Sequence, residues 1–154
     1  MIDVTQIRSE KLRALYRYWN SKRHGRPMPA RADIEPLEIP ALLPIIYLVD
    51  VEHAPQRFRV RLIGTQICAW TGRDPTGLYV DDPAYGPGAL EAAAGYTEVT
   101  ARREPFYRTR PPPWPDRDFH TYEELLLPLA TDGKTVDMLF CGMMVTRGQE
   151  RREH

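Results

Sequence analysis

The first 25 residues carry a helical pattern of apolar and polar positions. Four large side chains recur at spacings that place them on one stripe of a helix, namely Leu12, Leu15, Tyr16 and Trp19. Asp3 can cap the first turn, and Gly25 followed by Pro27 is typical of a helix end. The pattern predicts a helix over about residues 4–23, whose stripe must be buried against its own domain or against a second copy of the chain.

Residues 26–44 form a proline-rich segment. It contains Pro27, Pro29, Pro36, Pro40 and Pro44. Proline restricts its own backbone and that of the preceding residue, so this composition favours an extended segment, with a short helical turn near residues 38–43. Because Ile34 and Leu37 are too apolar for a free linker, we expect the segment to cross the surface of the domain. Arg31 and Asp33 are expected to tie it to the domain body.

Residues 45–147 carry the pattern of a mixed helix and strand domain. Residues 45–51 are rich in β-branched side chains, and residues 56–64 alternate between apolar and polar positions, so a hairpin is predicted. One face of its second strand is expected to hold Phe58, Val60 and Leu62. The opposite face would hold Arg57, Arg59 and Arg61, which fits a solvated sheet face, with an anion or partner site as the alternative.

Two helices and a short strand are predicted next. The first helix covers about residues 65–70 and ends at Gly72, and the second covers about 89–103. In the second helix, Leu90, Ala94 and Thr97 share one face, which we expect to be buried. Residues 106–110 read as a short strand.

The last two predicted strands, 121–131 and 134–146, flank Asp132–Gly133, a typical two-residue hairpin turn. That turn would pair Leu129 with Val136, Leu127 with Met138 and Leu125 with Phe140, all on the core face. The other face is also apolar, with Tyr122, Leu126, Leu139, Cys141 and Met143. Since a solvated face should be polar, we expect the N-terminal helix or a second copy to cover it.

The order of elements predicts an α+β fold, with a five-stranded antiparallel sheet, helices on one face and an extra N-terminal helix. The chain resembles the PAS_5 family of bacterial single-domain PAS-like proteins. The residues that carry the resemblance are Leu15–Trp19, Pro29–Pro36, Leu43–Pro44, Arg61–Thr65, Gly72–Gly77, Glu124–Leu129 and Asp132–Gly133. The resemblance implies a PAS-like sheet with helices that close a central pocket, in a sensory or interaction module.

Charge and composition narrow the function. The 21 basic and 21 acidic residues cancel, which argues against a nucleic-acid binder. No apolar run is long enough to span a membrane. Two distant cysteines, Cys68 and Cys141, make no disulfide framework, so a cytoplasmic location with reduced thiols is expected. Residues 148–154 read as a polar tail.

No motif in the chain supports catalysis or a metal site. The only serines, Ser9 and Ser21, lie in the first helix, and the histidines and cysteines lack zinc-like spacing. Glu123 and Glu124 alternate across a strand, so they cannot act as a pair. A flavin is disfavoured because Cys68 lacks the photoactive helix motif, and haem because the long predicted helix has no His. The cofactor is therefore unknown, and none is expected.

Three function classes remain. The first is a non-enzymatic sensory or protein-interaction module in signalling, which pairs with a second copy or binds a partner protein. Its predicted interface is Leu12, Leu15, Tyr16, Trp19, Tyr122, Leu126, Leu139 and Met143. The second is a receptor for a small apolar ligand or haem, and an unrecognised small enzyme is a remote third. The predicted pocket is Phe58, Val60, Leu62, Trp70, Leu78, Leu90, Ala94, Thr97, Leu125, Leu127, Met138 and Phe140, unless these residues simply fill the core.

Overall fold

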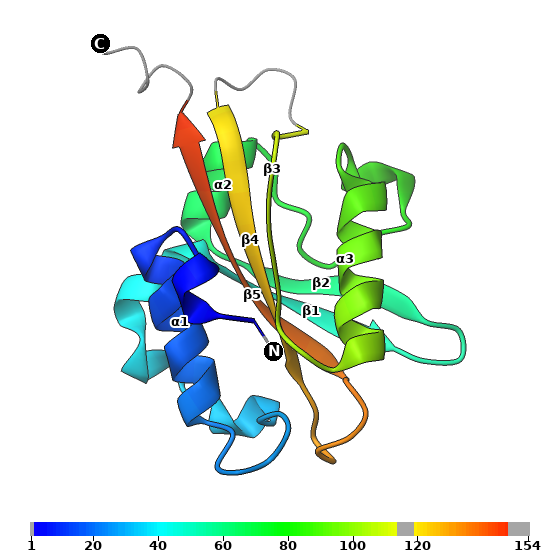
Figure 1. Cartoon of the computed structure of the whole chain (residues 1–154). Helices are drawn as coiled ribbons and strands as arrows, with labels where there is room; N and C mark the ends of the chain where they lie inside the picture. The colour runs from blue at the N-terminus through cyan, green and yellow to red at the C-terminus, as the bar shows by residue number, and fades with distance from the viewer. Residues whose placement is uncertain (1, 114–118, 148–154) are drawn as a thin grey trace.

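The computed structural model describes residues 2–113 and 119–147, so the predicted polar tail lies outside the described residues. One antiparallel sheet runs through the molecule in the spatial order β2-β1-β5-β4-β3 (Figure 1). The strands are β1 (Ile46–Glu52), β2 (Arg57–Ile63), β3 (Phe106–Arg110), β4 (Phe119–Leu129) and β5 (Met138–Arg147). The five-stranded antiparallel sheet and the α+β class predicted from the sequence are confirmed.

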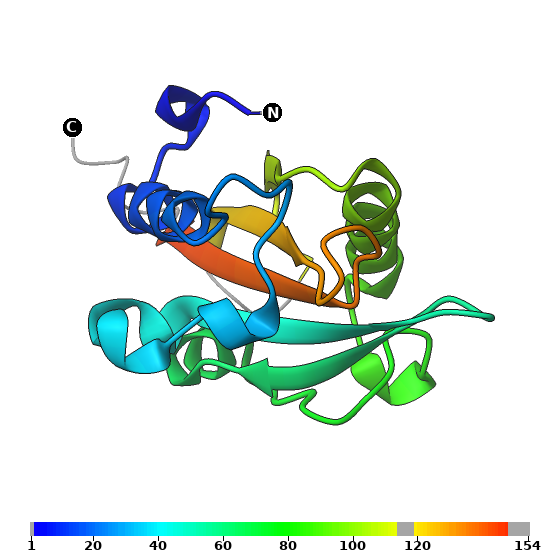
Figure 2. The same cartoon turned by 90° about the horizontal axis from the view of Figure 1, so that it is seen from below.

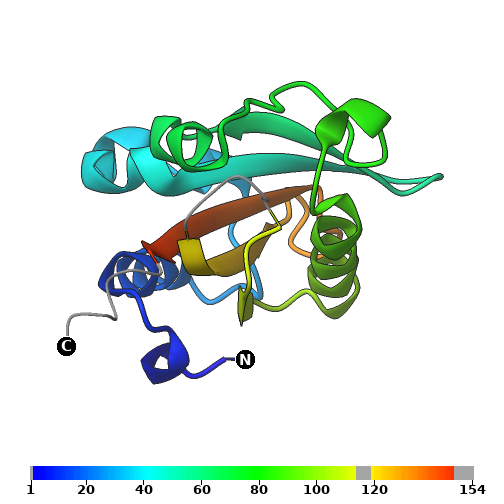
Figure 3. The same ribbon diagram turned by 90° about the horizontal axis from the view of Figure 1, so that it is seen from above.

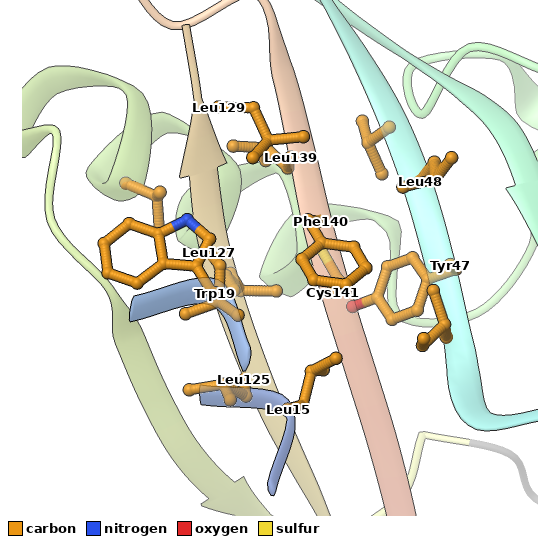
Figure 4. Packing of buried hydrophobic residues seen from close by; sticks show 14 of the residues in the cluster. Leu15, Trp19, Tyr47, Leu48, Leu125, Leu127, Leu129, Leu139, Phe140 and Cys141 are labelled. Carbon is orange, nitrogen blue, oxygen red and sulfur yellow. The ribbon is translucent and has the colours of Figure 1, made fainter. Parts of the chain in front are cut away.

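The N-terminal helix α1 (Glu10–Ser21) lies on one face of the sheet, against β4 and β5. Ser9 caps it, whereas Asp3 caps a separate short 3₁₀ turn, η1 (Val4–Gln6). The predicted stripe is buried as expected, against the same chain: Leu12, Leu15, Tyr16 and Trp19. Figure 4 shows Leu15 and Trp19 over Leu125 and Leu127 of β4.

Close packing of α1 depends on a glycine in β5. A Cβ atom at Gly142 would lie 2.7 Å from the Cδ2 atoms of both Leu12 and Leu15. The indole Nε1 of Trp19 donates a hydrogen bond of 2.9 Å to the carbonyl oxygen of Pro128, which is buried. Shape and a directional bond together therefore fix the helix on the sheet.

The other two α-helices, α2 (Thr65–Thr71) and α3 (Ala89–Arg102), lie on the opposite face. Figure 3 shows α1 and α2 on opposite sides of β5, and α3 packs against β3 and β4. The prediction that α1 covers the face of Tyr122, Leu126, Leu139 and Met143 is therefore wrong. Those residues face α2 and α3, while Leu125, Leu127 and Phe140 face α1. The alternation of side chains along β4 and β5 correctly assigns these residues to two opposite faces. Because both faces are apolar, the pattern does not indicate which helix covers which face.

The register of β4 and β5 also differs from the prediction. Leu129 pairs with Met138, Leu127 with Phe140 and Leu125 with Gly142. The loop between β4 and β5 is longer than two residues because the Asp132 side chain hydrogen-bonds within it. Asp132 Oδ1 accepts from the backbone N–H groups of Lys134 and Thr135, both at 2.8 Å. The register moves by an even number of residues, so each side chain keeps its predicted face.

A β-bulge changes the faces of β2. Leu48 pairs with Leu62 and Val49 with Val60, so Arg61 is the extra residue. Beyond the bulge, Leu62 lies on the face opposite to Phe58 and Val60, where it is 48% exposed. The prediction that Phe58, Val60 and Leu62 share one face is therefore wrong for Leu62, because the extra residue Arg61 shifts the alternation.

The buried face of α3 is also different from the predicted one. Its buried residues are Ala92, Gly95, Tyr96 and Val99. Leu90 is 86% exposed, and Ala94 and Thr97 are exposed as well. Because α3 is rich in alanine, its apolar moment is weak, and the large ring of Tyr96 determines which face is buried.

The proline-rich segment forms three short 3₁₀ turns, η2 (Arg31–Asp33), η3 (Pro36–Glu38) and η4 (Pro40–Ile45), below α1 in Figure 2. It is tied to α1 and to the residues after it, since Glu38 accepts from Tyr18 at 2.7 Å and pairs with Lys22. Asp33 pairs with Arg26 at 2.8 Å inside the same segment. The segment crosses the surface, but it forms 3₁₀ turns over most of its length, and a turn was expected only near residues 38–43. Within the described chain, the hydrogen bonds of Arg31 and Asp33 stay within residues 26–34, so the prediction that these two residues tie the segment to the domain body is wrong.

Candidate functional site

A small cavity lies between the sheet and the α2 and α3 side of the molecule. Its volume is about 60 Å³, well below the roughly 300–1,000 Å³ of a site for a drug-sized ligand. Its lining comes from four strands, β1, β2, β4 and β5, from α2 and α3, and from the segment between these helices: Tyr47, Val60, Ile63, Ile67, Thr71, Arg73, Pro75, Tyr85, Pro87, Tyr96, Glu124 and Met143. Apolar walls therefore surround a few converging polar groups.

A buried carboxylate forms the polar end of this cavity. Glu124 of β4 is 4% exposed. Its Oε1 accepts from Arg108 Nε at 2.9 Å, and its Oε2 accepts from the Tyr47 hydroxyl at 2.6 Å. Two charge-assisted hydrogen bonds offset part of the cost of burying the charge.

Arg108 reaches Glu124 beneath α3. Its Nη2 donates to the carbonyl oxygen of Glu91 at 2.8 Å. A Cβ atom at Gly95 would lie 3.1 Å from the same Nη2 atom, so the missing side chain leaves room for the guanidinium. Arg108 of β3 can therefore reach the Glu124 carboxylate because Gly95 of α3 leaves room for its guanidinium.

Three tyrosines extend the polar end into the cavity. Tyr85, Tyr96 and Tyr47 line the cavity together, and the side chain of each lies close enough to the next to affect its pKa. Burial, followed by the charge of Glu124, raises the pKa of Tyr47 well above its usual value. Burial also raises the pKa of Tyr96 and brings that of Tyr85 to about 12. At neutral pH the three hydroxyls are protonated, and each can donate or accept a hydrogen bond.

Arg73 and Gly86 meet beside the cavity. Arg73 Nη1 donates to the carbonyl oxygen of Tyr85 at 3.1 Å. Gly86 adopts φ 99° and ψ −163°, a conformation that essentially only glycine takes. A Cβ atom there would lie 1.3 Å from Arg73 Nη1, so the guanidinium occupies the space that any other residue would fill.

Most of the predicted pocket residues lie elsewhere. Val60 lines the cavity, and Phe58 packs edge-on against Tyr96 with ring centroids 5.5 Å apart. The others do not line it: Leu62, Trp70, Leu78, Leu90, Ala94, Thr97, Leu125, Leu127, Met138 and Phe140. Leu125, Leu127, Met138 and Phe140 lie on the sheet face that α1 covers, whereas the prediction placed them on the face of the pocket. Leu90, Ala94 and Thr97 lie on the exposed side of α3.

The sequence analysis missed the polar residues of the cavity. The family motifs Gly72–Gly77 and Glu124–Leu129 contain Arg73 and Glu124, but the sequence assigns neither of them, nor Tyr47, Tyr85 or Tyr96, to a ligand pocket. One signal was available: Glu124 directly precedes three consecutive leucines, Leu125 to Leu127, in a strand whose second half is apolar. A charge in such a strand needs a buried partner. Nothing in the sequence, however, identifies Arg108 as that partner.

Glu123 serves the opposite face, as the alternation predicted. Its Oε1 accepts from the Ser9 backbone N–H at 3.0 Å and from the Tyr107 hydroxyl at 2.8 Å. Tyr107 in turn accepts from the Arg8 backbone N–H at 3.0 Å. This carboxylate therefore anchors the start of α1, and it has no part in the cavity.

Three further features bear on chemistry. Cys68 and Cys141 are free, and burial raises the pKa of the Cys141 thiol well above its usual value. Within residues 2–113 and 119–147, no three metal-binding side chains come together at one point. No helix in the same ranges has the length and apolar character needed to cross a bilayer.

Comparison with protein families places these features in context. A family model described as a PAS domain, PAS_5, matches residues 7–145. The match covers most of the chain and includes α1, the proline-rich segment and the cavity residues. A comparison with curated proteins finds no match.

Proposed function

Because the chain belongs to the PAS_5 family of PAS domains, we propose that it is a sensory module that binds a small molecule in the Glu124 cavity without transforming it. The observation that carries the proposal is the buried Glu124 carboxylate, which accepts a hydrogen bond from Tyr47 and lines a cavity together with Tyr85 and Tyr96. Small-molecule sites combine apolar walls with a few convergent polar groups in this way.

A purely structural role accounts poorly for this arrangement. A buried ion pair is often no more stabilising than apolar residues of the same volume, because desolvation opposes the attraction. Here the Glu124 carboxylate of the pair also lines a cavity, which a larger side chain at Val60 or Thr71 would fill. Burial of charge beside open space is typical of sites where polar groups meet a ligand.

The size and lining of the cavity favour a molecule with few heavy atoms. Val60, Ile63, Ile67 and Met143 provide apolar contacts, and Glu124 provides a hydrogen-bond acceptor. A volume of about 60 Å³ holds a few water molecules or a similarly small group. This supports a small metabolite over the haem alternative.

The lining also favours binding over catalysis. No His, Cys or Ser is present among the described residues that line the cavity. The raised pKa values of Tyr47, Tyr85 and Tyr96 make these hydroxyls weak bases and weak nucleophiles at neutral pH. Two free cysteines fit a reducing compartment, which supports a cytoplasmic location.

The cavity proposal is tested by native mass spectrometry and thermal unfolding against a library of small metabolites. A bound molecule at 100 times its Kd stabilises the fold by about 2.7 kcal/mol, which raises Tm by roughly 5–10 °C for a chain of this length. Val60→Phe should abolish the shift by filling the cavity. Val4→Phe, a partly buried position outside the cavity, is the matched control and should retain it. If no compound shifts Tm or adds mass, the proposal is wrong.

A second observation favours signalling through a protein interface. Leu37, Leu43 and Leu62 are three of the four large apolar residues that are exposed in the described chain. Leu43 and Leu62 border an apolar groove of about 210 Å³ between the proline-rich segment and β1, and Leu37 lies beside it in η3. We propose that this groove, not the α1 stripe, binds a second copy of the chain. The α1 stripe is already buried on its own sheet.

Residues next to the groove can fill the same groove in a second copy of the chain. Leu37 is 84% exposed and follows Pro36, which lines the groove, so in a two-fold pair each copy can insert Leu37 into the groove of the other. Arg31 lines the groove and Glu35 is exposed nearby, so the same symmetry can bring opposite charges together. Strand β1 connects the two proposed sites, since Tyr47 faces the cavity and Leu48 lines the groove.

Leu37→Asp is expected to weaken the homodimer at least tenfold, because it places a charge in an apolar groove. Sedimentation velocity over a concentration series measures the dissociation constant. Leu90→Asp is the matched control, since Leu90 is equally exposed on α3, away from the groove. A wild-type chain that is monomeric at all concentrations would contradict the interface, as would equal effects of the two variants.

A further inference from the structure

Arg73 places a positive charge at the cavity that holds Glu124. It is exposed, yet it belongs to the cavity lining. It forms no ion pair with an acidic side chain in the described chain, in contrast to Arg26, Arg57 and Arg108. Its hydrogen bond to the Tyr85 carbonyl uses one N–H group, so the rest of the guanidinium is free to bind an anion.

The position of Arg73 is fixed by the backbone. Gly86 leaves the space that Nη1 occupies, and the Tyr85 carbonyl accepts its hydrogen bond. The guanidinium also lies close enough to the Tyr85 hydroxyl for its charge to act on that group. Arg73 and Tyr85 therefore offer two sets of donors at the same side of the cavity.

Glu124, which belongs to the same lining, has the opposite preference. Glu124 is an acceptor whose two oxygens each have one hydrogen bond, so each retains a lone pair. Its charge is balanced by Arg108 across a 2.9 Å contact, and this partner does not line the cavity. A ligand group that meets Glu124 must therefore be a hydrogen-bond donor, and a second carboxylate would be repelled.

We propose that the ligand is a short-chain carboxylic acid with a hydroxyl or amino group, in which Arg73 and Tyr85 bind the carboxylate and Glu124 accepts from the donor. The assignment rests on the proposed ligand-binding function of the cavity. Val60, Ile63 and Ile67 contact the short carbon chain between the two ends. A guanidinium provides paired donors that match the geometry of a carboxylate.

Matched acids and amides test this inference directly, because each pair differs only in the charge that Arg73 is expected to bind. The probes are glycolate with glycolamide and lactate with lactamide, titrated into the full chain by calorimetry. Wild-type protein is expected to bind at least one acid tenfold or more tightly than its amide. Arg73→Gln should reduce this ratio to about one, while Arg73→Lys should retain part of it.

Arg59→Gln is the matched control, because Arg59 is an exposed arginine on β2 that does not line the cavity. It should leave the acid-to-amide ratio unchanged, and circular dichroism should show that all variants are folded. Equal binding of acid and amide would overturn the carboxylate assignment, as would failure of both acids to bind. In either case, a Val60→Phe-sensitive Tm shift with any neutral compound would still support the cavity as a ligand site, so the two proposals fail separately.

Discussion

Glu124→Ala is expected to lower the free energy of unfolding by about 3–5 kcal/mol. The substitution leaves Arg108 without its partner while the Arg108 side chain is only 12% exposed. It also removes the acceptor of the 2.6 Å hydrogen bond from Tyr47. Urea unfolding followed by circular dichroism measures the loss. A change below about 1 kcal/mol would show that the pair is solvated, as a surface ion pair is.

A double variant separates stability from binding at the same position. Arg108→Met with Glu124→Leu replaces both charges by apolar groups of similar volume, and such replacements are often neutral or stabilising. We expect it to recover most of the stability that Glu124→Ala loses. It should nevertheless lose any ligand that binds the wild-type cavity, because the acceptor is gone. Retained binding would contradict the role proposed for Glu124.

Trp19→Ala is expected to lower the free energy of unfolding by about 3–5 kcal/mol. Trp19 is fully buried between α1 and the sheet, and its truncation leaves a large cavity. It also removes the donor to the Pro128 carbonyl. Trp19→Phe retains much of the packing and should cost less, chiefly through the unpaired carbonyl.

Arg17→Ala is the control for Trp19, because Arg17 lies on the exposed side of the same helix. It should change the free energy of unfolding by less than about 0.5 kcal/mol. If Trp19→Ala proved equally mild in urea unfolding, α1 would not be packed on its own sheet.

The local elements of the fold could be predicted from the sequence because their causes are local. The stripe that includes Leu15 and Trp19 repeats at the helical period, and Gly72 ends α2 in the left-handed conformation that glycine favours. The predicted strand at residues 106–110 coincides with β3. Alternation in β4 and β5 also sorted their side chains correctly into two faces.

Assignments that depend on distant residues were the ones that failed. The bulge at Arg61 moved Leu62 to the other face, and nothing in the alternation of β2 indicates it. The hairpin after Leu129 widened because Asp132 hydrogen-bonds to Lys134 and Thr135 in place of a tight turn. Each is a choice among several backbone arrangements that local sequence permits.

The sequence by itself determined the strands, the helices, the α+β class and the family, because periodicity, turn residues and motif order are properties of the chain. Only the tertiary structure decided which helix covers which apolar face and where the cavity lies. It also decided that Glu124, Arg108 and Tyr47 meet, although they come from three different strands. The physical reason is that a buried charge requires a partner but does not specify it, so the partner is fixed only when the strands and α3 pack together.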